Sequence, residues 1–282
     1  FVDGQLVPIP VNITTVNRLL GLNIETEAQM KAWLLQNTLK IEFPQNSEEV
    51  ALSKIGPVLY EKMIKNYTKK QWDLWPYELE ASVLERIPVR TNFDDRYFGD
   101  KYQAQPVGGF APLFEKMLNH PNITVRLNCD YFETKHKLSG FEKLFFTGPI
   151  DRFFNHKFDK LQYRSIRFDF ETHNREFYQE NSVINYPNDY DFTRIVEYKH
   201  ITKQNHPKTT ISREYSTWVG EPYYPVPTQR NREVYERYGR EAGKLEKGGI
   251  YFVGRLANYK YFNMDQAFKN SLDLFDKLNP KD

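Results

Sequence analysis

The chain has 282 residues, enough for two ordinary domains, and its 39 basic and 37 acidic residues leave a net charge of only +2. This balance argues against a general nucleic-acid binder, because such proteins carry a strongly basic face. The single cysteine, Cys129, excludes an internal disulfide framework and a zinc site made of cysteines, and no apolar run approaches the roughly 18 residues of a membrane span.

The first third of the sequence is predicted to be helical. Thr26 and Gln29 have the spacing of a capping box, and Asn46 indicates the start of another helix. Pro57 predicts a break or restart within that second helix. From residue 67 to residue 103, aromatic and charged residues mix without clean periodicity, a pattern typical of loops that contact ligands.

The middle and the end of the chain alternate between strand and helix patterns. Gly108 and Gly109 precede a predicted short helix. Segments bounded by turn residues then predict strands, several of them in an antiparallel sheet, over 123–129, 144–151, 163–170, 182–186, 193–200 and 209–216. The chain is predicted to close with a helix, a strand and an amphipathic helix, over 231–246, 249–255 and 264–278. This order suits a discontinuous domain that the C-terminal segment completes.

The segment VGRLANYKYFNMDQA, residues 253–267, carries the strongest sign of a ligand site. A predicted strand ends at Gly254, where a ligand can approach the backbone, and a helix begins near Met264. The N-terminus of a helix offers N–H donors to an anion, and Arg255 can add bidentate contacts to a phosphate. The residues alone leave an anion or dinucleotide site and a plain strand–loop–helix connection equally open.

Two other stretches combine aromatic residues with arginines. Tyr67 and Trp72 can stack on a nucleotide base, and Arg86 and Arg90 can meet phosphates, although composition alone favours a solvated loop here. Arg194 lies on a strand-like segment, where an arginine is more often a surface residue than a cleft residue. The sequence contains no metal-ligand spacing, G-x-S-x-G elbow or phosphate-binding loop, whereas glycoside hydrolysis by paired carboxylates stays open.

Taken in order, several segments resemble those of the bacterial UDP-galactopyranose mutases. They extend across nearly the whole chain: PVN (10–12), YTKKQW (67–72), RIPVR (86–90), FTGPID (146–151), TRIVEYKH (193–200), EYS (214–216), PYYP (222–225) and GRLANYKYFNMD (254–265). The glycine-rich dinucleotide fingerprint and the histidine-bearing loop of that family do not occur in this sequence. We therefore expect a form that lacks the N-terminal dinucleotide-binding segment.

The resemblance implies a mixed α/β (α+β) fold with three parts. These are a discontinuous, Rossmann-like FAD-binding domain that is incomplete here, a small helical domain that ends in a mobile substrate loop, and an antiparallel β-sheet domain that binds substrate. Their expected boundaries are, in that order, 1–12, 104–155 and 228–282 for the first domain, 13–85 for the second, and 86–103 and 156–227 for the third.

The resemblance also implies roles for individual residues. Arg194 and Arg86 match the two arginines that bind the substrate diphosphate, and we expect them to be catalytic. The expected substrate contacts are Tyr67, Thr68, Trp72, Tyr97, Asn185, Tyr224, Tyr261 and Asn263. The expected flavin contacts are Asn12, Gly148, Pro149, Arg255 and Met264. Asn263 stands where many relatives carry Asp, which leaves the preferred sugar open.

In activity, the resemblance implies an isomerase that interconverts UDP-galactopyranose and UDP-galactofuranose for the synthesis of cell-surface polysaccharides. The reaction of the family runs through a covalent adduct between the sugar and N5 of reduced FAD, so FAD is the expected cofactor. We expect UDP-galactose as the ligand, no nucleic acid, membrane or metal, a cytoplasmic location and a homodimer. The alternatives are a UDP-N-acetylgalactopyranose mutase, a flavin oxidoreductase of the amine-oxidase type and a non-catalytic nucleotide-sugar binding module.

Overall fold

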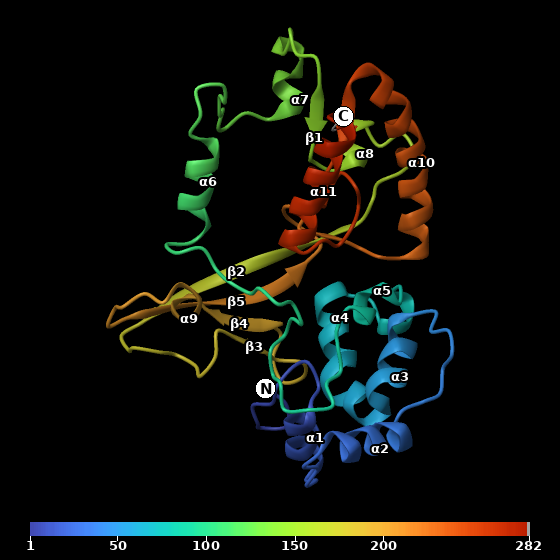
Figure 1. Cartoon of the computed structure of the whole chain (residues 1–282), viewed down its shortest axis with the longest axis vertical. Helices are drawn as coiled ribbons and strands as arrows, with labels where there is room; N and C mark the ends of the chain where they lie inside the picture. The colour runs from blue at the N-terminus through green and yellow to red at the C-terminus, as the bar shows by residue number, and fades with distance from the viewer. Residues whose placement is uncertain (281–282) are drawn as a thin grey trace. The chain divides into compact units, whose positions relative to one another are not determined.

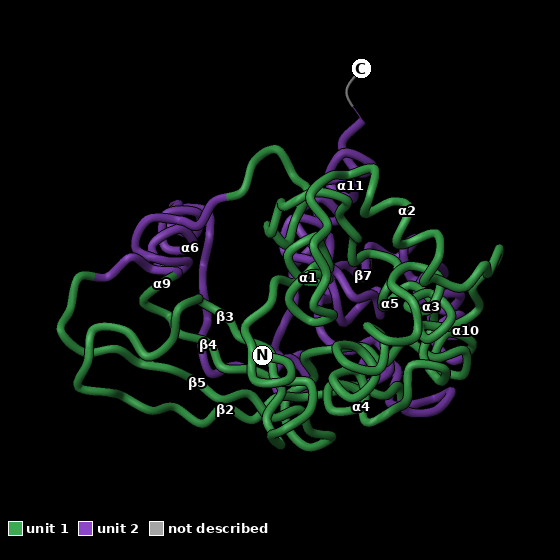
Figure 2. Tube along the Cα trace, turned by 90° about the horizontal axis from the view of Figure 1, so that it is seen from below, with its two compact units in different colours: residues 1–103, 161–200, 205–233 green, residues 104–160, 201–204, 234–282 purple. Residues whose placement is uncertain are grey.

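The computed structural model of the chain describes residues 1–280 and contains two compact units, which Figure 2 draws in different colours. Unit 1 comprises Phe1–Gln103, Leu161–His200 and Asn205–Glu233, and unit 2 comprises Ala104–Lys160, Ile201–Gln204 and the residues from Val234 onward. Residues 1–12, which the resemblance assigns to the FAD-binding domain, lie in unit 1. The division into three domains stays a prediction.

Helices form the N-terminal part of unit 1, as predicted. They are α1 (Ile13–Leu20), α2 (Glu27–Asn37), α3 (Ser47–Leu59), the π-helical η1 (Tyr60–Lys65), α4 (Asn66–Trp72), the 3₁₀ turn η2 (Pro76–Glu78) and α5 (Ser82–Glu85). Figure 1 shows α1 to α5 grouped together. Both predicted start signals are confirmed, because Thr26 and Asn46 accept hydrogen bonds from backbone N–H groups three residues later. Each cap satisfies a donor that the first helical turn leaves without a partner.

The predicted break near Pro57 is confirmed and lies at the residue before it. Gly56 has a φ of 76°, and α3 is kinked there. A Cβ at this position would lie 2.0 Å from the carbonyl oxygen of Asn37, so glycine is the residue that fits. The loop predicted from residue 67 onward is wrong at its start, because α4 stays helical as far as Trp72. Burial of that side chain stabilises a turn of helix that the sequence pattern does not reveal.

The antiparallel sheet that the sequence predicts lies in unit 1 and has the strand order β3-β4-β5-β2-β6. Its strands are β2 (Tyr163–His173), β3 (Val183–Asn185), β4 (Arg194–Glu197), β5 (Thr209–Thr217) and β6 (Tyr224–Pro225). The strand predicted over 193–200 ends early, and α9 (Tyr198–Thr202) follows it. Phe192, Ile195 and Ile211 form a buried cluster on this sheet.

Unit 2 is built around two parallel strands and a cluster of phenylalanines. Its elements are α6 (Phe110–Leu118), α7 (Tyr131–Thr134), η3 (Lys135–Lys137), β1 (Leu144–Phe146), α8 (Ile150–Phe153), most of α10 (Gln229–Leu245), η4 (Glu246–Gly248), β7 (Ile250–Phe252) and α11 (Met264–Leu278). The strand β1 pairs with β7 in parallel. The ring of Phe153 lies 5.0 Å from that of Phe146 and 4.8 Å from that of Phe252, so edge-to-face contacts join α8 to both strands.

The strand predicted over 123–129 is wrong, because the structure has no strand there. Its alternating apolar residues Ile123, Val125 and Leu127 are exposed, and no neighbouring strand pairs with them among residues 1–280. A strand needs a hydrogen-bonded neighbour, which alternation alone does not supply. Within the same described range, no helix combines the length and the apolar character needed to cross a membrane.

Candidate functional site

The helix α4 brings three of the expected substrate residues to one place in unit 1. Tyr67 is half-buried, whereas Thr68 and Trp72 are buried. The helix ends at Asp73, which adopts the left-handed conformation with a φ of 57°. Trp72 meets Tyr224 of β6 edge-on, with the ring centroids 6.3 Å apart. The YTKKQW and PYYP motifs, far apart in the sequence, therefore meet in the fold.

Two more expected residues face each other across the β3–β4 hairpin. Asn185 is the last residue of β3, Arg194 is the first of β4, and the two are directly paired in the antiparallel register. On the other side of β4, Arg194 pairs with Glu214 of β5, and its Nε donates to Oε2 of Glu214 at 2.5 Å. This contact fixes the guanidinium at the end of the sheet.

The electrostatic surroundings of Arg194 place it beside both motifs. Burial disfavours its charged form, but the oxygens of Tyr67, Glu214 and Tyr224 outweigh that effect and raise the pKa of the guanidinium above its ordinary value. Arg194 is therefore a permanent cation bordered by two phenols, a combination that suits a diphosphate. In addition, Oδ1 of Asn185 is buried and has no hydrogen-bond partner within residues 1–280. An unsatisfied buried acceptor beside a cation is typical of a site that a ligand completes.

Two residues that sequence analysis did not single out tie α4 to the sheet. Arg164 on β2 is buried, and its Nε donates to the carbonyl oxygen of Gln71 at 3.2 Å. Ser216 on β5 donates to the same carbonyl at 2.5 Å. The Trp218 indole completes this joint, because it lies 4.4 Å under the Arg164 guanidinium and donates to Asp73 at 2.8 Å. Of Arg164, Ser216 and Trp218, Ser216 alone belongs to a motif that the resemblance matched, EYS (214–216), and the resemblance gave that motif no role.

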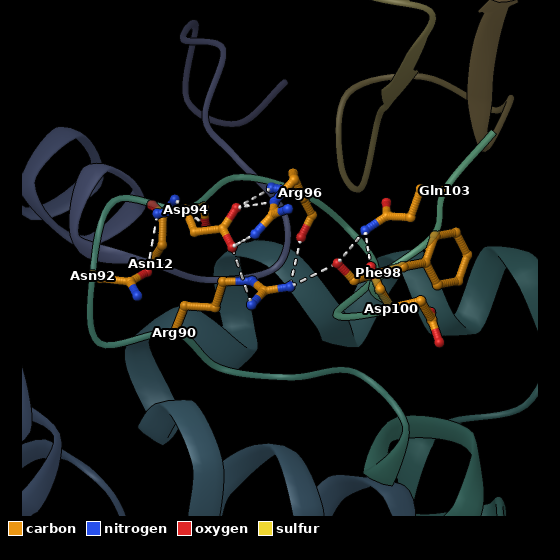
Figure 3. Close-up of polar contacts among 8 residues, drawn as sticks. All are labelled: Asn12, Arg90, Asn92, Asp94, Arg96, Phe98, Asp100 and Gln103. Carbon is orange, nitrogen blue, oxygen red and sulfur yellow. Dashed lines mark hydrogen bonds and ion pairs between the residues drawn. The ribbon is translucent and has the colours of Figure 1, made fainter.

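The segment that carries Tyr97 is held by a cluster around Arg90, drawn in Figure 3. The Arg90 guanidinium donates to the carbonyl oxygens of Arg96 at 2.9 Å and Phe98 at 3.1 Å, on either side of Tyr97, and lies 3.4 Å from Asp94. Hydrogen bonds from Arg96 hold the pKa of the Asp94 carboxyl well below its usual range. The structure thus gives Arg90 a role in shaping this segment, and a phosphate contact at Arg90 stays a prediction.

Arg86 lies at the C-terminal end of α5, and its side chain is exposed. Its backbone segment is held by Lys54 of α3, whose Nζ donates to the carbonyl oxygens of Leu84 at 3.3 Å, Glu85 at 2.6 Å and Ile87 at 3.0 Å. A cation is favourable at a helix C-terminus, where carbonyl groups lack helical partners. That Arg86 and Arg194 converge on one diphosphate stays a prediction.

Asn12, an expected flavin contact, has a structural role in unit 1. Its side chain is buried, caps α1 by accepting a bond from the N–H of Thr15 at 3.0 Å, and donates to the carbonyl oxygen of Asp94 at 3.3 Å, as Figure 3 shows. Asn12 therefore links the start of α1 to the Tyr97 segment. Its contact with the flavin stays a prediction.

The remaining expected residues lie in unit 2, near the ends of β1 and β7. Gly254 follows β7 with a φ of 98°, and a Cβ there would meet no atom of residues 1–280 within 4 Å. Arg255 donates to the carbonyl oxygen of Phe262, and its guanidinium lies 5.4 Å from the ring of Tyr261. Asn263 caps α11, and Met264 is its exposed first residue. An open glycine next to an arginine and a helix N-terminus fits the phosphates of a dinucleotide cofactor.

Gly148 and Pro149 connect β1 to α8 on the other strand of unit 2. A Cβ at Gly148 would lie 2.9 Å from the tip of the Phe146 ring, so a side chain here would have to displace that ring. Pro149 precedes the first residue of α8. Both residues follow the end of β1, whose partner strand β7 runs in the same direction and leads into Gly254. The cofactor residues expected in unit 2 thus come from the same ends of two paired strands.

Comparison with known proteins identifies the family. Residues 62–261 match the family described as GLF: UDP-galactopyranose mutase. The chain is 35% identical over 279 residues to a dTDP-fucopyranose mutase of Escherichia coli, an alignment that covers 96% of this chain and 74% of that protein. It is 34% identical over 282 residues to a probable UDP-galactopyranose mutase of Klebsiella pneumoniae, covering 98% and 72% of the two chains. It is also 34% identical over 248 residues to a UDP-galactopyranose mutase of Mycoplasma genitalium, covering 80% and 60%.

A solved structure shows the same fold. The crystal structure of a reduced UDP-galactopyranose mutase superposes with a TM-score of 0.68 at 15% identity, and the match covers 89% of this chain and 73% of that one. The mixed α/β fold with an antiparallel sheet is therefore confirmed. The family profile spans the Tyr67 and Arg194 motifs and ends at Tyr261, so the residues that meet in unit 1 lie inside the matched region. The chain belongs to the UDP-galactopyranose mutase family.

Proposed function

We propose that the protein interconverts the pyranose and furanose forms of a nucleotide diphosphate sugar, with UDP-galactose as its substrate. The observation that carries this proposal is the convergence of Tyr67, Arg194 and Tyr224, from three segments distant in sequence, on one end of a sheet. Family membership supports the reaction, because relatives that match most of this chain are named as sugar mutases. The same match favours a mutase over the amine-oxidase alternative.

In this proposal Arg194 binds the diphosphate and stabilises the charge that develops when the nucleotide leaves the sugar. Its Nε is held by Glu214, and the terminal nitrogens carry further N–H donors that suit phosphate oxygens. A fixed cation needs no reorganisation as charge develops, which is the basis of its catalytic effect. Tyr67 offers a flat face to the base, and the buried Oδ1 of Asn185 can accept a hydrogen bond from a sugar hydroxyl.

The reaction also requires a flavin, which we propose to be FAD in its reduced form. When bound, it supplies the nucleophile for exchange at the anomeric carbon. Gly254, Arg255 and the start of α11 at Met264 would hold it in unit 2, together with Gly148. The open space at Gly254 supports this assignment, because a side chain there would fill it. Tyr261 and Asn263, next to these residues in the sequence, remain proposed substrate contacts.

A second substrate, dTDP-fucopyranose, is favoured by the comparisons themselves. The relative that bears this name is 35% identical to the chain, and the probable UDP-galactopyranose mutase is 34% identical, so identity does not separate the two. The ligands differ in the methyl group on the base, in the ribose 2′-hydroxyl and in the hydroxyl at C6 of the sugar. A site that binds such hydroxyl groups by hydrogen bonds discriminates strongly against a ligand that lacks them.

The proposal is tested with the flavin-loaded protein and three furanose substrates, those of UDP-galactose, dTDP-fucose and UDP-N-acetylgalactosamine. Chromatography after incubation with dithionite should show conversion of UDP-galactofuranose to the pyranose, and the same mixture without reductant should show none. Preferential conversion of the dTDP-sugar would move the assignment to that substrate. If reduced, flavin-loaded protein converts none of the three, the proposed reaction is wrong.

Two further expectations accompany this function and rest on the resemblance. We propose a homodimer and a cytoplasmic location, where nucleotide sugars are available as substrates. Light scattering of the purified protein would test the first, since a mass of a single chain contradicts it. Fractionation of cells that produce the protein would test the second.

A further inference from the structure

Lys70, on the same helix as Tyr67 and Trp72, joins that helix to the loop of the β3–β4 hairpin. Its Nζ donates to the carbonyl oxygens of Tyr186, of Tyr190 at 2.7 Å and of Phe192 at 3.2 Å. An ammonium group has three N–H donors, and here three main-chain carbonyls accept from it. Neither the sequence pattern nor the resemblance gave Lys70 a role.

These three carbonyls belong to the loop that begins after Asn185 and ends before Arg194. The N–H of Tyr186 donates to the carbonyl oxygen of Thr193 at 2.9 Å, which closes the loop at its base. At its far end, Phe192 is buried in the cluster on the sheet, and the N–H of Thr193 donates to the carbonyl oxygen of Glu214 at 2.8 Å. The backbone that Lys70 holds therefore connects Asn185, the last residue of β3, directly to Arg194, the first residue of β4.

Two asparagines reinforce the contact between this loop and the helical segment. Nδ2 of Asn66 donates to Oδ1 of Asn188 at 2.9 Å, and Nδ2 of Asn188 donates to the carbonyl oxygen of Lys62 at 3.0 Å. Both asparagines are exposed, so water competes for these bonds. Lys70 is less exposed than the two asparagines, and its side chain is positively charged. Carbonyl oxygens bind a charged donor about twice as strongly as a neutral one.

We propose that Lys70 is a positioning residue of the nucleotide-sugar site, which sets Arg194 and Asn185 at a fixed place relative to Tyr67. This inference rests on the proposed function, because it concerns how the site for base, sugar and diphosphate is assembled. Tyr67 and Lys70 lie three residues apart, on one side of α4, so a shift of the loop on Lys70 changes the spacing between the base and diphosphate contacts. Lys70 acts through other residues and need not touch the ligand.

The protonation state of Lys70 provides a readout. Burial lowers its pKa to about 8, although Asp189 and Asp191 act in the opposite direction. The titratable side chains of this loop are Asp189, Asp191, Tyr186 and Tyr190, and at its base the N-terminal ammonium group of Phe1 donates to the carbonyl oxygen of Asn185 at 2.7 Å. Below about pH 8 the protonated amine can serve all three carbonyls. Above that pH it loses one N–H donor and its charge, so nucleotide affinity should fall as the pH rises from 7 to 9.

The test compares Lys70→Met, Lys70→Arg and the control Lys65→Met, which removes a lysine of the preceding turn that is paired with Glu61 at 2.7 Å. Calorimetric titration of the flavin-loaded protein with UDP at pH 7 and pH 9 gives the dissociation constants. At pH 7, Lys70→Met should raise the constant at least about tenfold, as expected when a charged hydrogen-bonding group is lost. Lys65→Met should bind UDP as the wild type does, and Lys70→Arg should retain most of the affinity.

The comparison between pH values separates positioning from general damage. Wild type and Lys65→Met should lose affinity between pH 7 and pH 9, whereas Lys70→Arg should not, because arginine stays protonated there. If Lys70→Met does not fold, this contrast decides the question by itself. Wild-type affinity in Lys70→Met, or the same loss at pH 9 in Lys70→Arg, overturns the role of Lys70. Wild-type protein that binds no UDP at either pH overturns instead the proposed function.

Discussion

Replacing Arg194 with Met should remove a ligand contact and at the same time leave a buried carboxylate without its partner. The Glu214 side chain is 7% exposed, and its Oε2 lies 2.5 Å from Nε of Arg194. Removing one member of a buried ion pair lowers the free energy of unfolding by about 3–5 kcal/mol, because the other charge stays buried without compensation. Since the Arg194 side chain is 31% exposed, solvent screens part of this effect, and we expect a loss of about 2–3 kcal/mol.

A second substitution, Glu214→Gln, separates folding from binding. In the double variant Arg194→Met/Glu214→Gln no buried charge is left over, so most of the lost free energy of unfolding should return. The loss of a charged hydrogen bond to the diphosphate remains in both variants and should weaken UDP binding by about 1.5–3 kcal/mol, or roughly 10- to 150-fold. Turnover should fall by about 10²–10³, as when an enzyme loses one donor that stabilises developing charge.

Three measurements follow these effects in the flavin-loaded protein. Urea denaturation gives the free energy of unfolding, calorimetric titration gives the dissociation constant for UDP, and chromatography of product gives turnover. Arg167→Met is a matched control on β2, because its ion pair with Asp169 is largely exposed and should contribute little to the free energy of unfolding. Wild-type UDP affinity in Arg194→Met would remove Arg194 from the site. A double variant as unstable as the single one would refute the account of Glu214.

Three other substitutions test the packing of unit 1. Trp72→Ala should lower the free energy of unfolding by about 3–5 kcal/mol, since the ring is buried, and should also weaken UDP binding; an unchanged dissociation constant contradicts the second part. Ile211→Ala, in the sheet cluster, should cost about 2–5 kcal/mol in urea denaturation, against less than about 0.5 kcal/mol for the exposed Val219→Ala. Gly56→Ala should lower the melting temperature because of the clash with a backbone oxygen, whereas Gly239→Ala in the open middle of α10 should raise it.

Local chemistry made part of this fold predictable from the sequence. The caps at Thr26 and Asn46 depend on residues three positions apart, and the kink next to Pro57 depends on one residue and its neighbour. The same holds for most strands of the antiparallel sheet, whose alternating side chains are bounded by turn residues. The strand expected at 123–129 shows the limit of this reasoning, because the pattern is present but no strand of the described part of the chain pairs with it.

The site residues to which the matched motifs gave a role were predictable. The residues that hold the site together through contacts between distant segments were not. The resemblance named Tyr67 and Arg194, and the structure brings both together. Arg164 and Lys70 went unnoticed because their partners are main-chain carbonyls 93 to 122 residues away in the sequence. A carbonyl carries no side-chain identity, so no sequence motif marks these contacts. Glu214 lay in a motif that the resemblance matched without giving it a role.

The joint between α4 and the sheet has a consequence for how this part of the molecule unfolds. A helix of seven residues is far too short to persist by itself in water. Because its last turn is bonded to Arg164 of β2 and Ser216 of β5, its amide hydrogens should exchange with solvent in the same cooperative step as those of the two central strands. The surface that we propose to receive the base should therefore be present only while the sheet is intact. A substitution that destabilises the strands should unfold this surface too, even when no residue of the surface is changed.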